Sequence, residues 1–474
     1  MGDSSEAVMY RHASFLTTAA LAALATVAGC GDSQHNTPLL DAPAPPDAPP
    51  DMSPPPDMPP DETPPPSCDI AWTDQQLGTE LDDQVWGMAT DDRHNVYVVG
   101  YEHGVTGVTN IEPDGDAHGV IMQLAPTGEV RWKTVVDTSA SDTVEGVAID
   151  AASHRIYAVG RTAGSFPGFT NQGQFDAFLV GLDAAGHMTA LLQSGDDRPA
   201  HPTRLSLGSD HDLAVAGFDD TWIPTNNVAA EEDGFIAKFD RGTTPDAAFA
   251  QTMLQKVPVT SPNRITDVVV ERDGSGAMYV TSVVTGRRND PGIFVKKLNR
   301  DGTVVWSNKI SPITADAANA VGLSPQNELF VAGATFQTLP GQVSAGQQDA
   351  YVLKLDKATG AILWAAQGGS DQSDYPTAMA FDAAGNVFVA GYTLGAVTKD
   401  ANRGGIDAFA MKFDATGTRV SSWQAGTAAD DFVTSMTVDA CGKAFIGGHS
   451  KGAVVAGHDT TAGGYDMFIM RTTL

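Results

Sequence analysis

Alternating apolar and polar residues in the stretch Asp349–Gly391 predict four short strands joined by tight turns. The expected strands span residues 349–356, 361–367, 377–382 and 387–393, and each is rich in Val, Leu, Phe, Tyr or Trp. The strands end near Gly, Asp or Asn, which favour turns because they tolerate unusual backbone angles or hydrogen-bond to their own backbone.

Looser copies of this unit fill most of the chain, and they align best on a strand that ends in Gly. The first and last of these glycines, Gly100 and Gly448, are 348 residues apart, so the six intervals between seven copies average 58 residues (348/6). Seven units of this period with four strands each predict an all-β fold, a seven-bladed β-propeller over residues 68–474. The copies are YVVG at Tyr97, YAVG at Tyr157, LAVAG at Leu213, YVTS at Tyr279, FVAG at Phe330, FVAG at Phe388 and FIGG at Phe445.

A second strand pattern recurs in the same units, usually with an acidic residue at its start and a turn at its end. We expect the acidic residue to bond backbone donors where the chain re-enters the sheet. The strand that follows often carries Trp, which we expect to fill the wide outer space between blades. The acidic starts are clearest at Asp176, Asp233, Asp349 and Asp407, and the tryptophans are Trp132, Trp306, Trp364 and Trp423.

The two ends of the repeat array complement each other. The chain ends in the third strand of the seventh unit, which therefore lacks its outer strand, while Asp69–Gly78 resembles an outer strand without a blade of its own. We expect this N-terminal strand to pair with Tyr465–Thr472, which would close the ring and hide both sheet edges. Cys68 precedes that strand and Cys441 lies in a turn of the same blade, so closure predicts a disulfide between them. Two unpaired thiols are the alternative.

An apolar run over residues 13–29 follows Arg11 near the N-terminus. It is shorter than the roughly 20 residues of a membrane-spanning helix and is typical of a signal peptide. Residues 27–30, Val-Ala-Gly-Cys, resemble the bacterial lipobox, in which the signal is cut before a cysteine that then carries lipid. The resemblance implies a lipoprotein signal peptide over residues 1–29 and acyl chains such as palmitate on Cys30; an ordinary cleavage site is the alternative.

Residues 31–67 contain 14 Pro and 7 acidic residues, with no Lys or Arg. Proline removes backbone donors and favours extended polyproline II, so this segment cannot build a core. We therefore expect residues 30–67 to form a disordered tether between the lipid and the propeller. Gly31 stands where an Asp would resemble an inner-membrane retention signal, which favours the outer membrane as the location.

The chain has 58 acidic and 28 basic residues, a formal net charge of −30. Such a charge repels nucleic acid and anionic membrane surfaces, so we expect no nucleic-acid partner and membrane contact only through the N-terminal lipid. The three cysteines, Cys30, Cys68 and Cys441, exclude a disulfide-dense scaffold and a four-cysteine zinc site. We also expect a monomer.

Few segments match a catalytic or ligand-binding motif. The sequence GHSKG at 448–452 matches G-x-S-x-G, but it follows a propeller strand and lacks the strand-to-helix turn on which that motif is catalytic. The acidic loops 112–118, 195–201 and 229–234 lack the regular ligand spacing of a calcium site. We therefore assign no catalytic residue, no metal ligand and no cofactor.

The segments GNVFVAGYT at 385–393 and DAFAMKFDATG at 407–417, followed by Trp and a Gly-Asp loop, resemble the SBBP (seven-bladed β-propeller) repeat of bacterial exported and surface proteins. The resemblance extends over residues 69–474 and is weakest near Tyr279, where Ser282 replaces the glycine. It implies a propeller, and it implies no shared catalytic residue.

Long loops between the second and third strands point to a binding or scaffold function, because loops on a rigid scaffold commonly carry binding residues. We expect the partner to be an envelope protein or a glycan. Candidate exposed aromatic residues in these loops are Phe166, Phe169, Trp222 and Phe336, each of which is alternatively a loop anchor.

An enzyme is the alternative function, either a quinoprotein-like dehydrogenase or a propeller that acts on polysaccharide. The segment TGAILW at 359–364 is similar to the tryptophan-docking motif of quinoprotein propellers, although that motif is structural there as well. A purely structural spacer of the envelope is a third possibility.

Overall fold

The computed structural model describes residues 67–474, apart from 107–112, 115–116, 210, 222–230, 245–246, 257–262, 285–291, 312–315, 400–401 and 458–463. These described residues belong to one compact unit, Pro55–Leu474. Cys30 and the predicted signal peptide lie outside them, as does the tether up to Pro66. No helix among the described residues is long and apolar enough to cross a membrane.

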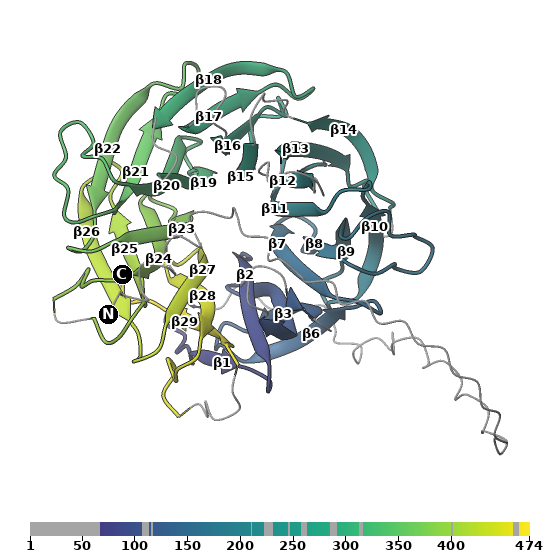
Figure 1. Cartoon of the computed structure of the whole chain (residues 1–474), viewed down its shortest axis with the longest axis horizontal. Helices are drawn as coiled ribbons and strands as arrows, with labels where there is room; N and C mark the ends of the chain where they lie inside the picture. Colours follow the sequence, from purple (N-terminus) through teal and green to yellow (C-terminus); the bar gives the residue numbers. More distant parts are fainter. Residues whose placement is uncertain are drawn as a thin grey trace, which may run out of the picture. The chain divides into compact units, whose positions relative to one another are not determined.

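Seven four-stranded antiparallel sheets form a ring, with the first strand of each sheet nearest the centre and the fourth at the outside (Figure 1). The fold is therefore the predicted seven-bladed β-propeller. Blade 1 contains β2 (Asp82–Thr90), β3 (Val96–Thr106), β5 (His118–Leu124) and β6 (Val130–Val136), with the short β4 (Pro113–Asp114) paired to β3; blade 2 contains β7 (Asp142–Asp150), β8 (Arg155–Thr162), β9 (Asp176–Leu182) and β10 (Met188–Ser194); blade 3 contains β11 (Ala200–Leu207), β12 (Asp212–Thr221), β13 (Glu231–Asp240) and β14 (Ala250–Lys256).

The remaining four blades continue the same meander. Blade 4 contains β15 (Asn263–Val270), β16 (Met278–Val284), β17 (Gly292–Leu298) and β18 (Val304–Ser311); blade 5 contains β19 (Ala317–Leu323), β20 (Leu329–Thr335), β21 (Asp349–Leu355) and β22 (Ile362–Gly368); blade 6 contains β23 (Asp374–Phe381), β24 (Val387–Thr393), β25 (Asp407–Phe413) and β26 (Arg419–Ala425); blade 7 contains β27 (Asp431–Val438), β28 (Ala444–Ser450), β29 (Asp466–Arg471) and β1 (Gln75–Leu77).

Apolar side chains fill the space between neighbouring blades. Each of the seven buried apolar clusters in the described part of the chain joins two adjacent blades. The predicted role of tryptophan in the outer strands is confirmed at Trp364 in blade 5, whose ring lies against Gly417 in a turn of blade 6. A Cβ atom on Gly417 would come within 2.8 Å of that ring. The core is therefore a ring of interfaces.

The glycine that recurs near the end of the second strand of the blades is required for a steric reason. In blade 6, the register between β23 and β24 shifts between Pro376 and Ala378, which is a β-bulge in the first strand. A Cβ atom on Gly391, opposite this bulge, would lie 1.9 Å from the Tyr375 carbonyl oxygen. The backbones can approach this closely only where the second strand has no side chain.

Ring closure follows the prediction, with a shorter strand than expected. β1 pairs with β29 through only three residues, Gln75–Leu77. The residues before it hold blades 7 and 1 together by other contacts: Thr73 N donates to Thr127 O at 2.8 Å, and Trp72 packs edge-on against Phe445 with ring centroids 4.7 Å apart. The expected strand over residues 69–78 is therefore limited to its second half.

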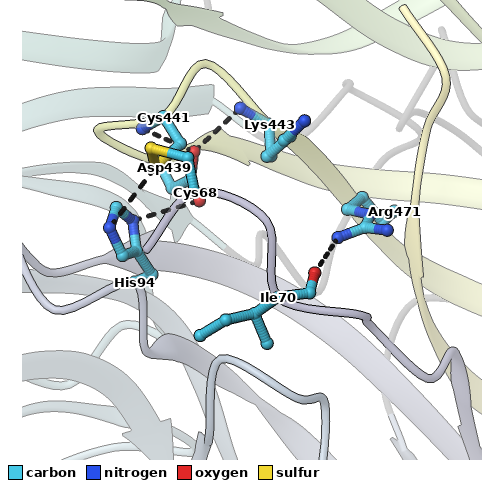
Figure 2. Close-up of a disulfide and its surroundings, with 7 residues drawn as sticks. All are labelled: Cys68, Ile70, His94, Asp439, Cys441, Lys443 and Arg471. Atoms are coloured by element: carbon cyan, nitrogen blue, oxygen red, sulfur yellow. Dashed lines mark hydrogen bonds and ion pairs between the residues drawn. A yellow bond between two sulfur atoms is a disulfide. The ribbon is translucent and has the colours of Figure 1, made fainter. Parts of the chain in front are cut away.

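The predicted disulfide is present in the structure. Cys68 and Cys441 are joined, with their Cα atoms 5.5 Å apart and their positions 373 residues apart in sequence (Figure 2). A second link lies beside it, where the Arg471 guanidinium donates to the Ile70 carbonyl oxygen at 3.0 Å. The N-terminal segment is thus fixed to the last blade by a covalent bond, a short strand and an arginine contact.

Candidate functional site

Two sets of loops lie on one rim of the ring, which we call the loop face. One set joins the second strand of a blade to the third, and the other joins the fourth strand to the first strand of the next blade. Because successive strands are antiparallel, both sets leave the sheets on the same side. The tight hairpin turns lie on the opposite rim, which we call the turn face.

Aspartates at the start of the first strands fix the loops that lead into them. Asp374 accepts a hydrogen bond from Ser370 N at 2.7 Å and another from the Thr393 hydroxyl at 2.6 Å. Asp142 accepts the equivalent bond from Thr138 N at 2.7 Å. Burial raises the pKa of both carboxyl groups to about 6, although these hydrogen bonds lower it. The corresponding residues of blades 1, 5 and 7 are Asp83, Asp316 and Asp431.

A glutamine in the fourth strand fixes the loop between the second and third strands. In blade 6, the Gln424 amide donates to Asp407 Oδ2 at 2.9 Å and to the Gly395 carbonyl oxygen at 2.9 Å. Its own oxygen accepts from Val397 N at 2.8 Å. One side chain thus forms hydrogen bonds with the aspartate that starts the third strand, with one backbone N–H of the loop and with one backbone carbonyl oxygen of the loop. We call such a residue a loop-clamp glutamine.

The loop clamp recurs in three other blades. In blade 2, Gln193 bonds Asp176, the Gly164 carbonyl oxygen and the Phe166 amide at 2.9 to 3.0 Å. Gln367 makes the equivalent three bonds in blade 5, at 2.8 to 2.9 Å.

In blade 7 the N-terminal strand supplies the clamp. Gln76 donates to the Gly452 carbonyl oxygen at 2.8 Å and accepts from Val455 N at 3.1 Å. Ring closure therefore also fixes a loop on the loop face.

The sequence pattern predicted that the third-strand aspartates bond backbone donors, as Asp407 does with Arg403 N at 3.0 Å and Asp349 with Ala345 N at 3.0 Å, but it missed the first-strand aspartates and the glutamines. The four loop-clamp glutamines stand in the same register, opposite Phe178, Tyr351, Phe409 and Phe468 of the third strands. In blades 1, 3 and 4 that position holds Val135, Lys256 and Lys309. A shared Q-x-G in the aligned outer strands was the available signal: QLG at Gln76, QSG at Gln193, QGG at Gln367 and QAG at Gln424.

The four candidate aromatic residues have different surroundings. Phe166 is buried and packs edge-on against Phe178 with centroids 5.3 Å apart, so the expectation that it is exposed is wrong and it is a loop anchor. Phe169 is partly buried against the same cluster. Phe336 is 45% exposed on the loop after β20. Trp222 lies outside the described residues.

The G-x-S-x-G segment has a structural role. Ser450 is fully buried, and its hydroxyl bonds Asp431, the aspartate that starts the first strand of the same blade. The neighbouring His449 ring stacks on Phe432 with centroids 5.3 Å apart. Ser450 therefore takes part in the hydrogen bonds that fix the loop before β27, and its hydroxyl does not face solvent.

Polar side chains gather where blades 2 and 3 reach the loop face. Arg161 Nε lies 3.4 Å from Glu145 Oε1, and its Nη1 lies 2.8 Å from His201 Nδ1. The Thr143 hydroxyl donates to Glu145 at 2.8 Å, and the His201 ring stacks on Phe218 with centroids 4.8 Å apart. Glu145, Arg161 and His201 are all buried.

Other blades have different residue types at the same paired positions of the first and second strands. The pair Thr143 and Arg161 of blade 2 corresponds to Tyr375 and Tyr392 in blade 6, whose rings stack with centroids 5.2 Å apart. Several blades thus share the aspartates and glutamines whose hydrogen bonds fix the loops, whereas the side chains at the loop-face ends of the inner strands differ from blade to blade.

A cavity of about 180 Å³ lies between blades 2 and 3. Apolar side chains such as Phe178, Leu192 and Phe235 form most of its wall, and Asp196 and Asp219 are also among the lining residues. The two carboxylates are joined by Arg198, whose Nη2 lies 3.1 Å from Asp196 and 3.2 Å from Asp219.

The comparison with protein-family models agrees with this architecture. A search of curated proteins finds no match. Among solved structures, Sqt1 from Chaetomium thermophilum is similar, with 14% sequence identity, a TM-score of 0.43, and coverage of 80% of this chain and 83% of that one. Residues 364–397, which run from the outer strand of blade 5 into the loop of blade 6, match the family model SBBP, described as a beta-propeller repeat. The chain therefore carries the SBBP β-propeller repeat within a seven-bladed β-propeller.

Proposed function

We propose that this protein is a binding module of the bacterial envelope that recognises a protein or a glycan through its loop face. The observation that carries this proposal is the loop clamp, because it repeats in four blades and acts on the loops of one face only. Fixing a loop before it meets a partner lowers the entropy lost on binding. Exposed loop side chains on that face, such as Phe336 and Val343, supply the specificity.

The blade 5 loop is the best described candidate for direct contact. Phe336 is 45% exposed and Val343 is 83% exposed, although both follow a buried strand. The loop is fixed at several points: Phe336 N donates to Asp316 at 2.9 Å, and Gln367 holds Leu339 N at 2.8 Å. An exposed aromatic ring on a rigid loop suits stacking against a sugar ring or a partner's apolar side chain.

A binding experiment on the secreted, lipid-free chain tests this proposal. The Cys30→Ser chain should retain a specific envelope protein in pull-downs or a specific glycan on an array. The double change Phe336→Ser and Val343→Ser should weaken that binding by 10-fold or more. Leu363→Ser is the matched control, because Leu363 is 58% exposed on the outer strand β22, away from the loop face. Equal loss of binding in the control, or none in the double variant, would refute the placement of the site.

The lipid anchor is a separate part of the proposal and rests on the sequence at residues 27–30. Cys30 is modified with lipid, and the proline-rich residues 31–67 hold the propeller away from the outer membrane. Cys30→Ser should abolish fatty-acid labelling and release the protein from membrane fractions. Unchanged labelling would contradict lipidation at this cysteine and would leave the binding proposal standing.

A further inference from the structure

Three side chains from separate segments meet on the turn face, at the seam between blades 7 and 1 (Figure 2). Cys68 comes from the N-terminal segment, Cys441 from the turn between β27 and β28, and His94 from the turn between β2 and β3. His94 Nε2 lies 3.4 Å from Cys441 Sγ. The three ligand atoms lie within 4.8 Å of one another, and within the described residues no other group of His, Cys, Asp or Glu is as close.

A carboxylate lies beside the far ring nitrogen of this histidine. Asp439 Oδ2 lies 3.2 Å from His94 Nδ1, so Nε2 points toward the two sulfurs. The other oxygen of Asp439 accepts from Cys441 N at 2.9 Å and from Lys443 N at 2.8 Å, which fixes the carboxylate in the turn. Both His94 and Asp439 are buried. A carboxylate behind the far nitrogen is the usual support of a metal-binding histidine.

We propose that reduction of the Cys68–Cys441 disulfide creates a metal site of the zinc class, with Cys68, Cys441 and His94 as ligands. An external dithiol supplies two electrons that break the S–S bond, its two protons pass to the cysteine sulfurs, and the dithiol becomes a disulfide. A Zn²⁺ ion then replaces both thiol protons, which are released to solvent. Two thiolates and one imidazole suit Zn²⁺, which takes four ligands.

The geometry of the seam accommodates this change. Zinc–sulfur bonds are about 2.3 Å long, so two thiolates on one tetrahedral ion lie about 3.8 Å apart. The Cα atoms of the two cysteines are 5.5 Å apart, and rotation about the Cα–Cβ bonds can separate the sulfurs to that distance. Cys68 is exposed, so water can occupy the fourth position from the solvent side. The N-terminal segment would thus remain joined to blades 7 and 1 in both redox states.

Metal binding to the reduced chain tests the proposal. The Cys30→Ser chain leaves only Cys68 and Cys441 as cysteines. A phosphine reductant supplies the same two electrons and becomes the phosphine oxide, leaving no competing thiol. The reduced chain should bind one Zn²⁺ per molecule, and Co²⁺ in its place should give the sulfur-to-cobalt charge-transfer band of a thiolate site. The oxidised chain should bind neither ion at the same concentration.

Variants separate this site from adventitious binding. Asp439→Asn should weaken Zn²⁺ binding by about 10- to 100-fold, as loss of such a supporting carboxylate does. His94→Asn should weaken it further, and it preserves the turn because Asn327 adopts the same positive φ, 62° against 63° at His94. His154→Asn is the matched control, since His154 has φ 54° in the corresponding turn of blade 2. Zinc binding that persists when both cysteines are changed to serine, or cobalt binding without the charge-transfer band, would overturn the proposal.

Discussion

Two interfaces of the ring have different side chains at the same outer-strand position. Between blades 5 and 6, the Trp364 ring fills the outer space against Gly417. Between blades 2 and 3, the corresponding outer-strand position holds Ala190, and Phe249 of blade 3 packs into the cluster beside it. A cavity of about 180 Å³ remains at this second interface. One large ring thus fills the first interface, whereas at the second a small residue and a ring from the next blade share that position, and a cavity lined by other side chains lies in the same interface.

The difference shows that departures from the repeat stay local. Blade 3 also lacks the first-strand aspartate, having Ala200, and the loop-clamp glutamine, having Lys256. Its turn-face end keeps a lysine–carboxylate pair that blades 5 and 6 also have: Lys238 Nζ lies 2.9 Å from Asp212, as Lys354 Nζ lies 2.8 Å from Glu328 and Lys412 Nζ 3.3 Å from Asp382. Because each blade contacts only its neighbours, a lost feature changes one or two interfaces and leaves the rest of the ring intact.

The largest effect is expected from opening the filled interface. Trp364→Ala should leave a space between blades 5 and 6 and lower the free energy of unfolding by about 3 kcal/mol, because the lost packing is not recovered. Urea unfolding followed by tryptophan fluorescence and circular dichroism measures this change. Val420→Ala is the control, since Val420 is 60% exposed on β26 and should cost at most about 0.5 kcal/mol. Equal costs for the two variants would mean that the tryptophan ring does not support the interface.

Removing a loop clamp should have the next largest effect. Gln424→Ala leaves Asp407, Val397 N and the Gly395 carbonyl oxygen without their partner, and should cost about 2 kcal/mol. It should also make the loop before β25 more sensitive to proteases. Val135→Ala changes the same register position in blade 1, where the side chain is apolar and 43% exposed, and should cost at most about 0.5 kcal/mol. A protease-resistant loop in the glutamine variant would argue against the clamp.

The first-strand aspartates should make stability depend on pH. Burial raises the pKa of Asp374 to about 6, above its ordinary value of 3.8, so the folded protein holds this proton more tightly than the unfolded chain. The stabilising contribution is complete below about pH 4 and is lost as the pH rises through 6, on the order of 1 kcal/mol. Asp374→Asn should therefore reduce the fall in unfolding free energy between pH 4 and 6, measured by urea titrations. An unchanged slope would show that this carboxyl group does not titrate in that range.

The smallest effect is expected from filling the cavity between blades 2 and 3. Leu254 lines the cavity and is 53% exposed, so Leu254→Phe can place a larger side chain there without displacing the core. We expect a gain of up to about 1 kcal/mol. A clear loss in the same denaturation assay would mean that the cavity cannot accept added volume.

Much of the architecture could be predicted from the sequence, because it depends on local periodicity. The six intervals between Gly100 and Gly448, which average 58 residues, indicated the blade number, and the unpaired segment before the first blade indicated the ring closure. The Cys68–Cys441 bond followed from closure, because a meander brings the start of one strand and a neighbouring turn to the same rim. These inferences need only the order of strands and turns.

Contacts between segments decided the rest. The burial of Phe166, the Gln424 clamp and the three-residue length of β1 depend on which side chains meet across strands and blades. Contacts between side chains of different strands leave no periodic pattern in any one strand. An aromatic residue in a loop therefore looks the same in sequence whether it is buried or exposed. The sequence by itself determined the ring and its closing bond, and only the tertiary structure decided which loop residues are anchored and which face solvent.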